Sequence, residues 1–186
     1  MSTIDPQSAL AAIAASPNDN GQLELIVLRP VTNARRVVDH CELSKTGGLH
    51  GDSWAKGCWK KLPDGSPHPD VQISLMNSRC IQAIAGTPEN WPPAGDNLFV
   101  DFYLSLANLK PGDQLAIGSA IIQLTNVDHA PCGKFSSRYG QDAFQFLDDP
   151  EHKTLNLRGI FARVVKDGQI ATGDRIRKVQ PDLGLD

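Results

Sequence analysis

The sequence lacks the features of membrane-spanning, disulfide-rich and zinc-binding proteins. No apolar run approaches the length of about 20 residues that a transmembrane helix requires. The four cysteines form no CxxC pair, so neither zinc-knuckle nor thioredoxin-like spacing is present. The first residues show no basic region followed by a long apolar core, so we expect no secretory signal. These absences predict a cytoplasmic protein with reduced thiols and no membrane association.

The sequence also has little net charge and shows no familiar nucleotide-binding or redox-cofactor motif. Its formal net charge is -3, which gives no electrostatic reason to bind nucleic acid or an acidic membrane surface. The glycine-rich segment TGGLHGD at 46–52 lacks the spacing of a P-loop or a dinucleotide fingerprint. No flavin, haem or iron-sulfur signature is present, so a reductase with this sequence would need electrons from a separate protein.

The length and composition predict one compact domain that is mainly β. A chain of 186 residues with 40% hydrophobic residues can bury a substantial core. Short runs with strand-like patterns recur between turn signals, and the Asp167-Gly168 pair predicts a hairpin. The predicted strands are 22–28, 35–43, 71–75, 114–118, 119–127, 159–165 and 175–179. Helices are predicted after Asp5-Pro6, over 77–85 with Asn77 or Ser78 as a cap and Cys80 in the core, and over 136–147.

Two charged segments have simple interpretations at this point. Arg35 and Arg36 are expected on a solvated edge, because charged side chains are commonly exposed. The polar, proline-rich segment Lys56 to Pro69 predicts a long ordered loop over a cleft. The sequence leaves open whether this loop is a lid or an ordinary surface excursion.

The most informative stretch is Asn126 to Gly140, with the sequence NVDHAPCGKFSSRYG. It follows a strand-like run and places Cys132 on a turn near His129, Lys134 and Arg138. Positive charge near a cysteine stabilises the thiolate, which is the form that attacks electrophiles and binds soft metals. Free cysteine is also often a small buried hydrophobe, so both interpretations stay open.

The fragments AGDNLFVDF, LKPGDQLAIGSAIIQLTNV, PCGKF, RGIFARVV and DGQIATGD occur in this order. Together they resemble the molybdenum cofactor sulfurase C-terminal domain, called the MOSC domain, from about Leu23 to Val179. The resemblance implies a β-barrel with a few peripheral α-helices. The implied organisation is an N-terminal helix and connection over 1–22, the MOSC domain over 23–180, and a C-terminal tail over 181–186.

The resemblance also implies roles for individual residues. Cys132 matches the lone cysteine that ligates molybdenum or carries sulfur, and is the expected catalytic residue. The family-like positions expected to bind the molybdenum cofactor (molybdopterin) are Gly51, Asp52, Asp96, Asn97, Lys134 and Arg158, and the charge of Arg138 adds it to this set. Among these, the three cations are candidates for the pterin phosphate, whereas surface solvation or carboxylate pairing is their structural alternative. Many relatives have Arg-His after the first-loop Gly-Asp, where this chain has Ser53-Trp54.

Three functions follow from these residues, and the sequence leaves open whether the protein is an enzyme. The resemblance implies reduction of N-hydroxylated small molecules by the molybdenum cofactor, with electrons from a separate redox protein. The first alternative is a non-catalytic carrier of cofactor or sulfur that uses Cys132. The second is a metal-free thiol enzyme with His129 as base and Cys132 as nucleophile. His50 and His68 are left outside these hypotheses because a lone histidine is commonly structural or exposed.

Overall fold

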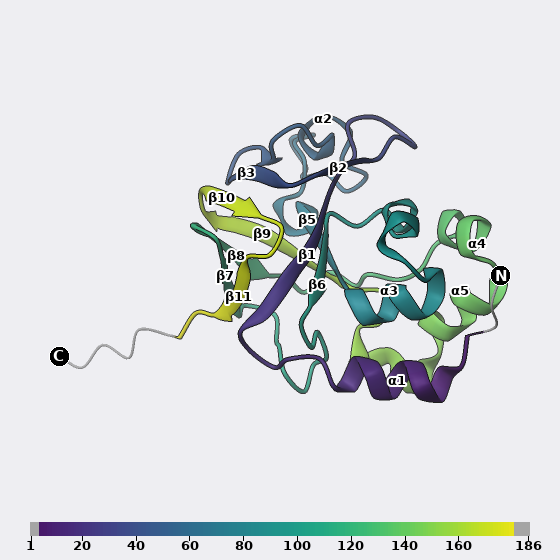
Figure 1. Ribbon diagram of the computed structural model, residues 1–186. Helices are drawn as coiled ribbons and strands as arrows, with labels where there is room; N and C mark the ends of the chain where they lie inside the picture. The colour runs from purple at the N-terminus through teal and green to yellow at the C-terminus, as the bar shows by residue number, and fades with distance from the viewer. Residues whose placement is uncertain (1–3, 181–186) are drawn as a thin grey trace.

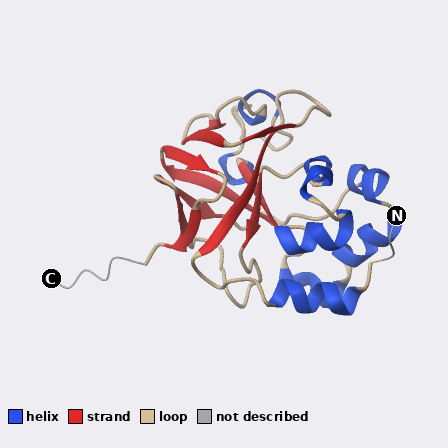
Figure 2. Ribbon diagram, in the orientation of Figure 1, coloured by secondary structure: helices blue, strands red, loops and turns tan. Residues whose placement is uncertain are grey.

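The computed structural model describes residues 4–180 and shows a closed β-barrel with helices on one side (Figures 1 and 2). Seven strands form the barrel, and pairing of the last with the first closes it. Their order is β11 (Arg175–Lys178), β7 (Gln114–Ile117), β8 (Ala120–Leu124), β9 (Ile160–Lys166), β5 (Ile73–Asn77), β6 (Leu98–Asp101) and β1 (Gly21–Leu28). Among the strands of residues 4–180, β5 and β6 are the one parallel pair. The predicted barrel with peripheral helices is confirmed.

Two hydrophobic cores fix the barrel and its helices. Alternate side chains of β7 and β8 are buried and join aliphatic residues of the other strands inside the barrel, as the two-residue period of a strand requires. All five residues of β5 are buried. A second core, which includes Met76, Phe99, Phe135 and Phe146, lies between the outer barrel face and the helices. Strands such as β5 therefore contribute to both cores.

The helices gather beside the barrel (Figure 2). They are α1 (Pro6–Ala14), α3 (Ser78–Ala85), α4 (Gly133–Tyr139) and α5 (Gln141–Asp148), while α2 (Trp54–Gly57) lies apart above β2. The remaining turns are the 3₁₀ helices η1 (Pro69–Val71), η2 (Pro88–Asn90), η3 (Pro92–Ala94) and η4 (Pro150–Leu155). No helix over residues 4–180 is long and apolar enough to cross a membrane.

Of the two residues predicted to cap the helix after β5, Asn77 and Ser78, the structure shows Asn77. The Asn77 side chain accepts a hydrogen bond from the Cys80 backbone N–H at 3.0 Å, and Cys80 is fully buried as expected. The predicted helix over 136–147 is instead two helices. Gly140 separates α4 from α5 with a φ of 92°, a conformation that favours glycine and interrupts a helix.

The predicted strand over 35–43 is also divided. Its first part is β2 (Arg36–Val38), which pairs with β1, and its second part is β3 (His40–Ser44). β3 belongs to a separate three-stranded sheet with β4 (Gly48–Leu49) and β10 (Gly168–Ala171). The two segments therefore extend different sheets.

The hairpin predicted at Asp167-Gly168 is wrong. β9 ends at Lys166 and β10 begins at Gly168, but β10 pairs with β3 instead of returning along β9. A Cβ atom at Gly168 would lie 2.4 Å from the Ala120 backbone nitrogen, so glycine here lets the start of β10 approach the start of β8 closely. The predicted tail over 181–186 lies outside the described residues.

Candidate functional site

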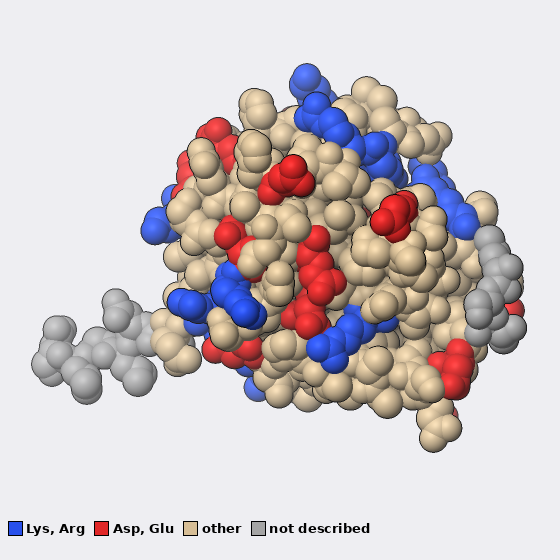
Figure 3. Space-filling view, viewed as in Figure 1, with Lys and Arg blue, Asp and Glu red and all other residues tan. Residues whose placement is uncertain are grey.

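A basic cavity of about 460 Å³ lies between α2, α4 and the connection from β1 to β2. Five cationic side chains line it: Arg29, Arg35, Lys56, Lys134 and Arg138. Asp52 is the one carboxylate in its wall. In Figure 3, Lys and Arg side chains follow the surface from the region of α2 toward α4. A concave surface lined by one sign of charge attracts ligands of the opposite sign, so this cavity favours an anion.

Asp52 fixes the orientation of Arg29. Its carboxylate accepts hydrogen bonds from Arg29 Nε at 3.1 Å and Nη2 at 3.1 Å, which is a bidentate ion pair. The carboxylate also accepts from the backbone N–H groups of Arg29, at 2.8 Å, and of Trp54, at 3.0 Å. With its side chain only 1% exposed, Asp52 acts by holding Arg29 and does not compete for an anion.

Asn97 connects Asp52 to the barrel. Its Nδ2 donates to Asp52 Oδ2 at 3.1 Å and to the Val27 carbonyl oxygen at 3.2 Å, while its Oδ1 accepts from the Ser74 backbone N–H at 3.2 Å. Asn97 is fully buried, and its amide forms hydrogen bonds to β5, to β1 and to the loop that carries Asp52. The structure thus brings the predicted residues Asp52 and Asn97 together. Asn97 holds the Asp52 carboxylate, and that carboxylate holds the Arg29 guanidinium.

Arg35 and Arg138 lie beside Gly95. A Cβ atom at Gly95 would be 3.3 Å from Arg35 Nη2 and 3.9 Å from Arg138 Nη1. Arg138 donates to the Pro93 carbonyl oxygen at 2.7 Å, and Arg35 donates to the Ala34 carbonyl oxygen at 2.7 Å. The Nε atom of Arg35 is buried and has no hydrogen-bond partner in the described chain. Unpaired buried donors are costly, so this group favours a bound acceptor.

The expectation that Arg35 lies on a solvated edge is wrong. Arg35 is partly buried in the cavity wall, because the chain turns there before β2 begins. Burial, together with the positive charges of Arg138 and Arg29, lowers the pKa of Arg35 from its ordinary value. Such a shift means that the surroundings disfavour the charged form, and an anion in the cavity would reverse part of it. Arg36, one residue later, is exposed as expected.

Cys132 precedes α4 directly and is exposed, whereas Cys41, Cys58 and Cys80 are buried. The interpretation of Cys132 as a buried hydrophobe is therefore wrong. It lies two residues before Lys134 in sequence but is not among the side chains that line the basic cavity. No group of three His, Cys, Asp or Glu side chains within residues 4–180 could hold a metal ion alone. The thiol could contribute one ligand to a metal that brings its own.

A second arginine–carboxylate pair lies in the interior. Arg158 Nη1 donates to Asp96 Oδ2 at 2.6 Å and Nη2 donates to the Ala94 carbonyl oxygen at 3.1 Å. Asp96 is fully buried and the Arg158 side chain is 8% exposed. Neither residue lines the basic cavity. For Arg158 the structure shows the carboxylate pairing that was the alternative to a cofactor contact.

His129 belongs to this interior cluster. Its Nε2 atom lies 3.8 Å from Asp96 Oδ1, and its ring centroid is 4.1 Å from that of Phe161. Burial, with smaller effects from the charges of Arg158 and Arg29, lowers the pKa of His129 well below its ordinary value. The Nδ1 atom of His129 is buried without a hydrogen-bond partner in the described chain, and no hydrogen bond within residues 4–180 joins His129 to the exposed Cys132 thiol. The thiol-enzyme hypothesis therefore lacks its expected base contact.

Gly51 shapes the first loop without lining the cavity. Its φ is 88°, and a Cβ atom there would lie 3.0 Å from Arg36 Nη2. Of the predicted cofactor residues, only Asp52, Lys134 and Arg138 line the basic cavity. Sequence reasoning missed three cavity cations, Arg29, Arg35 and Lys56. Arg29 carried a usable signal, because it is the first polar residue after the apolar end of β1.

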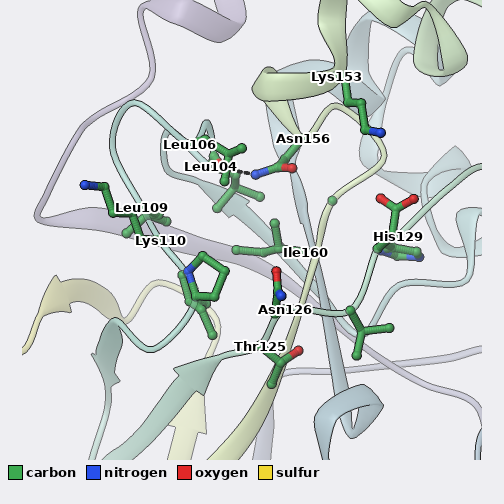
Figure 4. Close-up of a pocket in the computed structure, with 15 residues that line it drawn as sticks. Leu104, Leu106, Leu109, Lys110, Thr125, Asn126, His129, Lys153, Asn156 and Ile160 are labelled. Carbon is green, nitrogen blue, oxygen red and sulfur yellow. Dashed lines mark hydrogen bonds between the residues drawn. The ribbon is translucent and has the colours of Figure 1, made fainter.

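A second cavity of about 320 Å³ contains neither Cys132 nor any of the predicted cofactor-binding residues (Figure 4). Its wall is largely apolar and includes Leu104, Leu109 and Ile160, with Lys110 and Lys153 at different sides of the opening. His129 lines this cavity and stacks on Phe161, which lines the basic one. The His129–Phe161 pair thus contributes to the walls of both cavities. Because Asp52, Lys134 and Arg138 line the basic cavity, we take that cavity as the candidate functional site.

Comparisons with known proteins identify the family. The family model described as "MOSC domain" matches residues 49–177. No curated protein matches the sequence. Among solved structures, the YUAD protein from Bacillus subtilis is 21% identical with a TM-score of 0.60, and the match covers 87% of this chain and 97% of that one. YiiM from Escherichia coli is 19% identical with a TM-score of 0.54, covering 86% and 70%. These structural likenesses support the fold, and the family match shows that the chain belongs to the MOSC domain family.

Proposed function

We propose that the protein binds the molybdenum cofactor through its phosphate in the basic cavity and reduces N-hydroxylated small molecules. One observation carries this proposal: five cationic side chains from three separate segments converge on one cavity. Membership of a family associated with this cofactor supports the choice of anion. Electrons would come from a separate redox protein.

The residues present fit a phosphate group. Arg35 offers a buried donor without a partner, and the Asp52 carboxylate is already occupied by Arg29, Trp54 and Asn97. Guanidinium groups bind phosphate oxygens well because their donors match the geometry of the anion. The cavity volume of about 460 Å³ is ordinary for a cofactor or ligand site.

Each group has a distinct role in this proposal. Arg35, Lys134 and Arg138 hold the phosphate, while Asp52 keeps Arg29 directed into the cavity. The exposed Cys132 side chain would supply a soft sulfur ligand for the metal. When bound, the cofactor supplies a metal centre that exchanges two electrons. In the overall reduction the substrate N–O bond breaks, and two electrons and two protons convert the N–OH group into N–H and water.

The test is the amount of molybdenum retained per chain after incubation with freshly released cofactor. Wild type, Cys132→Ser and Arg138→Met are compared, with far-ultraviolet circular dichroism to verify folding. Retention by wild type that falls in both variants supports the phosphate cavity and thiolate ligation. If Cys132→Ser retains as much molybdenum as wild type, the thiol is not a ligand of the metal. No retention by folded wild type would contradict the proposal.

A carrier of cofactor or sulfur is the second candidate, because an exposed thiol such as Cys132 can also hold a transferable sulfur. The two functions separate in one assay. Loaded protein that receives electrons from a chemical donor reduces an N-hydroxylated compound if it is an enzyme. Retained molybdenum without turnover would favour the carrier.

A further inference from the structure

The second cavity, of about 320 Å³, combines an apolar wall with charged groups. Leu104, Leu109 and Leu124 line it and are buried. Asp128 and Lys153 also line it, and neither belongs to the basic cavity. An apolar wall with a few polar groups is typical of small-molecule sites, and this volume is at the small end of their range. We call it the leucine-lined cavity.

The polar groups gather where the leucine-lined cavity meets a smaller one. Asp128, Lys153 and Asn156 line both this cavity and a neighbouring cavity of about 270 Å³. The three buried leucines line the first cavity and not the second. Lys110, the other cation of the leucine-lined cavity, lies on a different side from Lys153 (Figure 4). A ligand would therefore place its polar group at this junction and its apolar part among the leucines.

The junction offers one group of each charge. Asp128 and Lys153 are both exposed, and no ion pair within residues 4–180 includes either of them. Asn156 Nδ2 donates to the Leu104 carbonyl oxygen at 2.8 Å, which leaves the Asn156 Oδ1 atom as an acceptor (Figure 4). A ligand carboxylate would pair with Lys153, and a ligand ammonium group would pair with Asp128 and Asn156 Oδ1. A ligand with a carboxylate alone would be repelled by Asp128.

Hydrogen bonds join the two loops that form much of this wall. The Leu106 backbone N–H donates to the Thr154 carbonyl oxygen at 2.9 Å, and the same oxygen accepts from Ser105 Oγ at 3.1 Å. With the bond from Asn156 to Leu104, these contacts fix the loop that carries the leucines against the loop that carries the lysine. A site that is formed before the ligand arrives loses less entropy on binding.

We propose that the leucine-lined cavity binds a free α-amino acid with an apolar side chain, such as leucine. The ammonium and carboxylate groups of an α-amino acid are attached to one carbon atom, so both can reach the unlike charges at the junction. Its side chain then enters the apolar part of the cavity. This site is separate from the basic cavity, and the proposal holds whether or not the protein binds the molybdenum cofactor.

The test is isothermal titration calorimetry of the purified protein with L-leucine and three analogues. 4-Methylpentanoate lacks the ammonium group, 3-methylbutylamine lacks the carboxylate, and glycine lacks the apolar side chain. The variants are Asp128→Asn and Lys153→Met. Lys110→Met is the control on another side of the same cavity, and Arg138→Met is the control in the basic cavity. Far-ultraviolet circular dichroism verifies folding of each variant.

We expect wild type to bind L-leucine roughly tenfold more tightly than each analogue, because each analogue lacks one group that the cavity contacts. Asp128→Asn and Lys153→Met should each weaken leucine binding roughly tenfold, while both controls should bind it as wild type does. No binding of leucine by folded wild type, or equal binding of 4-methylpentanoate, would overturn the proposal. Unchanged affinity in Asp128→Asn or Lys153→Met would also overturn it. Weaker binding in Arg138→Met would place leucine in the basic cavity, and weaker binding in Lys110→Met would contradict the head-group position.

Discussion

Two arginine–carboxylate pairs of the same chemistry serve different regions of this molecule. Arg29 and Asp52 are joined at 3.1 Å at the basic cavity, where the Arg29 side chain is 24% exposed. Arg158 and Asp96 are joined at 2.6 Å in the interior, where the exposed fractions are 8% and 0%. The first pair presents a cation to a cavity. The second encloses both charges beside His129 and Phe135.

The comparison shows how the surroundings of an ion pair determine its use. Around Asp52, backbone and amide donors satisfy the carboxylate, so Arg29 can face a ligand. Around Asp96, the Oδ1 atom has no hydrogen-bond partner in the described chain, and neither does Arg158 Nε. Because these groups are buried, removing either charge would leave the other uncompensated. We therefore expect the interior pair to govern stability and the cavity pair to govern binding.

The largest expected effect follows from Asp96→Asn. This change leaves the buried Arg158 guanidinium without its counter-charge and should lower the free energy of unfolding by about 3 to 5 kcal/mol. The matched control is Asp101→Asn, whose partner Arg79 is 31% exposed; it should cost about 1 kcal/mol or less. Urea unfolding measures both. Equal losses in the two variants would show that burial does not distinguish these pairs.

The next effect concerns the pH dependence of stability. Because burial lowers the pKa of His129, the unfolded chain binds its proton more readily than the folded protein. The contribution of His129 to the free energy of unfolding is therefore fully present above the ordinary histidine pKa. It is lost as the pH falls below that pKa, by about 2 kcal/mol between pH 7 and pH 5. His129→Phe keeps a ring against Phe161 and should remove this loss.

The measurement is urea unfolding at several pH values for wild type, His129→Phe and His40→Gln, a control at an exposed histidine. Burial raises the pKa of Asp96, although Arg158 opposes the shift, so Asp96 alone would act in the opposite direction. The difference between wild type and His129→Phe isolates the histidine. The same pH slope in all three proteins would contradict its assignment.

Much of the fold could be predicted because its signals are local. The cap at Asn77, the buried Cys80 and most strands follow from residue order alone. The partner of β10 could not be predicted, because turn residues indicate where a strand begins but not which distant strand receives it. For the same reason, the chain order did not show that 35–43 is shared between two sheets.

The candidate site was predicted in part for a similar reason. Lys134 and Arg138 lie near Cys132 in sequence, so they could be selected together, and both line the cavity. Arg35 lies about one hundred residues away from them along the chain, and only the tertiary fold brings it into the same cavity. Likewise, the pairing of Arg158 with Asp96 is invisible in sequence because the two residues are 62 positions apart.

The decisive experiment for the basic cavity is the binding of inorganic phosphate to wild type, Arg35→Met and Arg36→Met by isothermal titration calorimetry. Arg35→Met should weaken binding roughly tenfold without loss of stability, since it removes a cavity cation whose Nε has no partner. Arg36→Met, a change at the exposed neighbour, should bind phosphate as wild type does. Equal affinity in wild type and Arg35→Met, or equal weakening in both variants, would contradict an anion site built around Arg35.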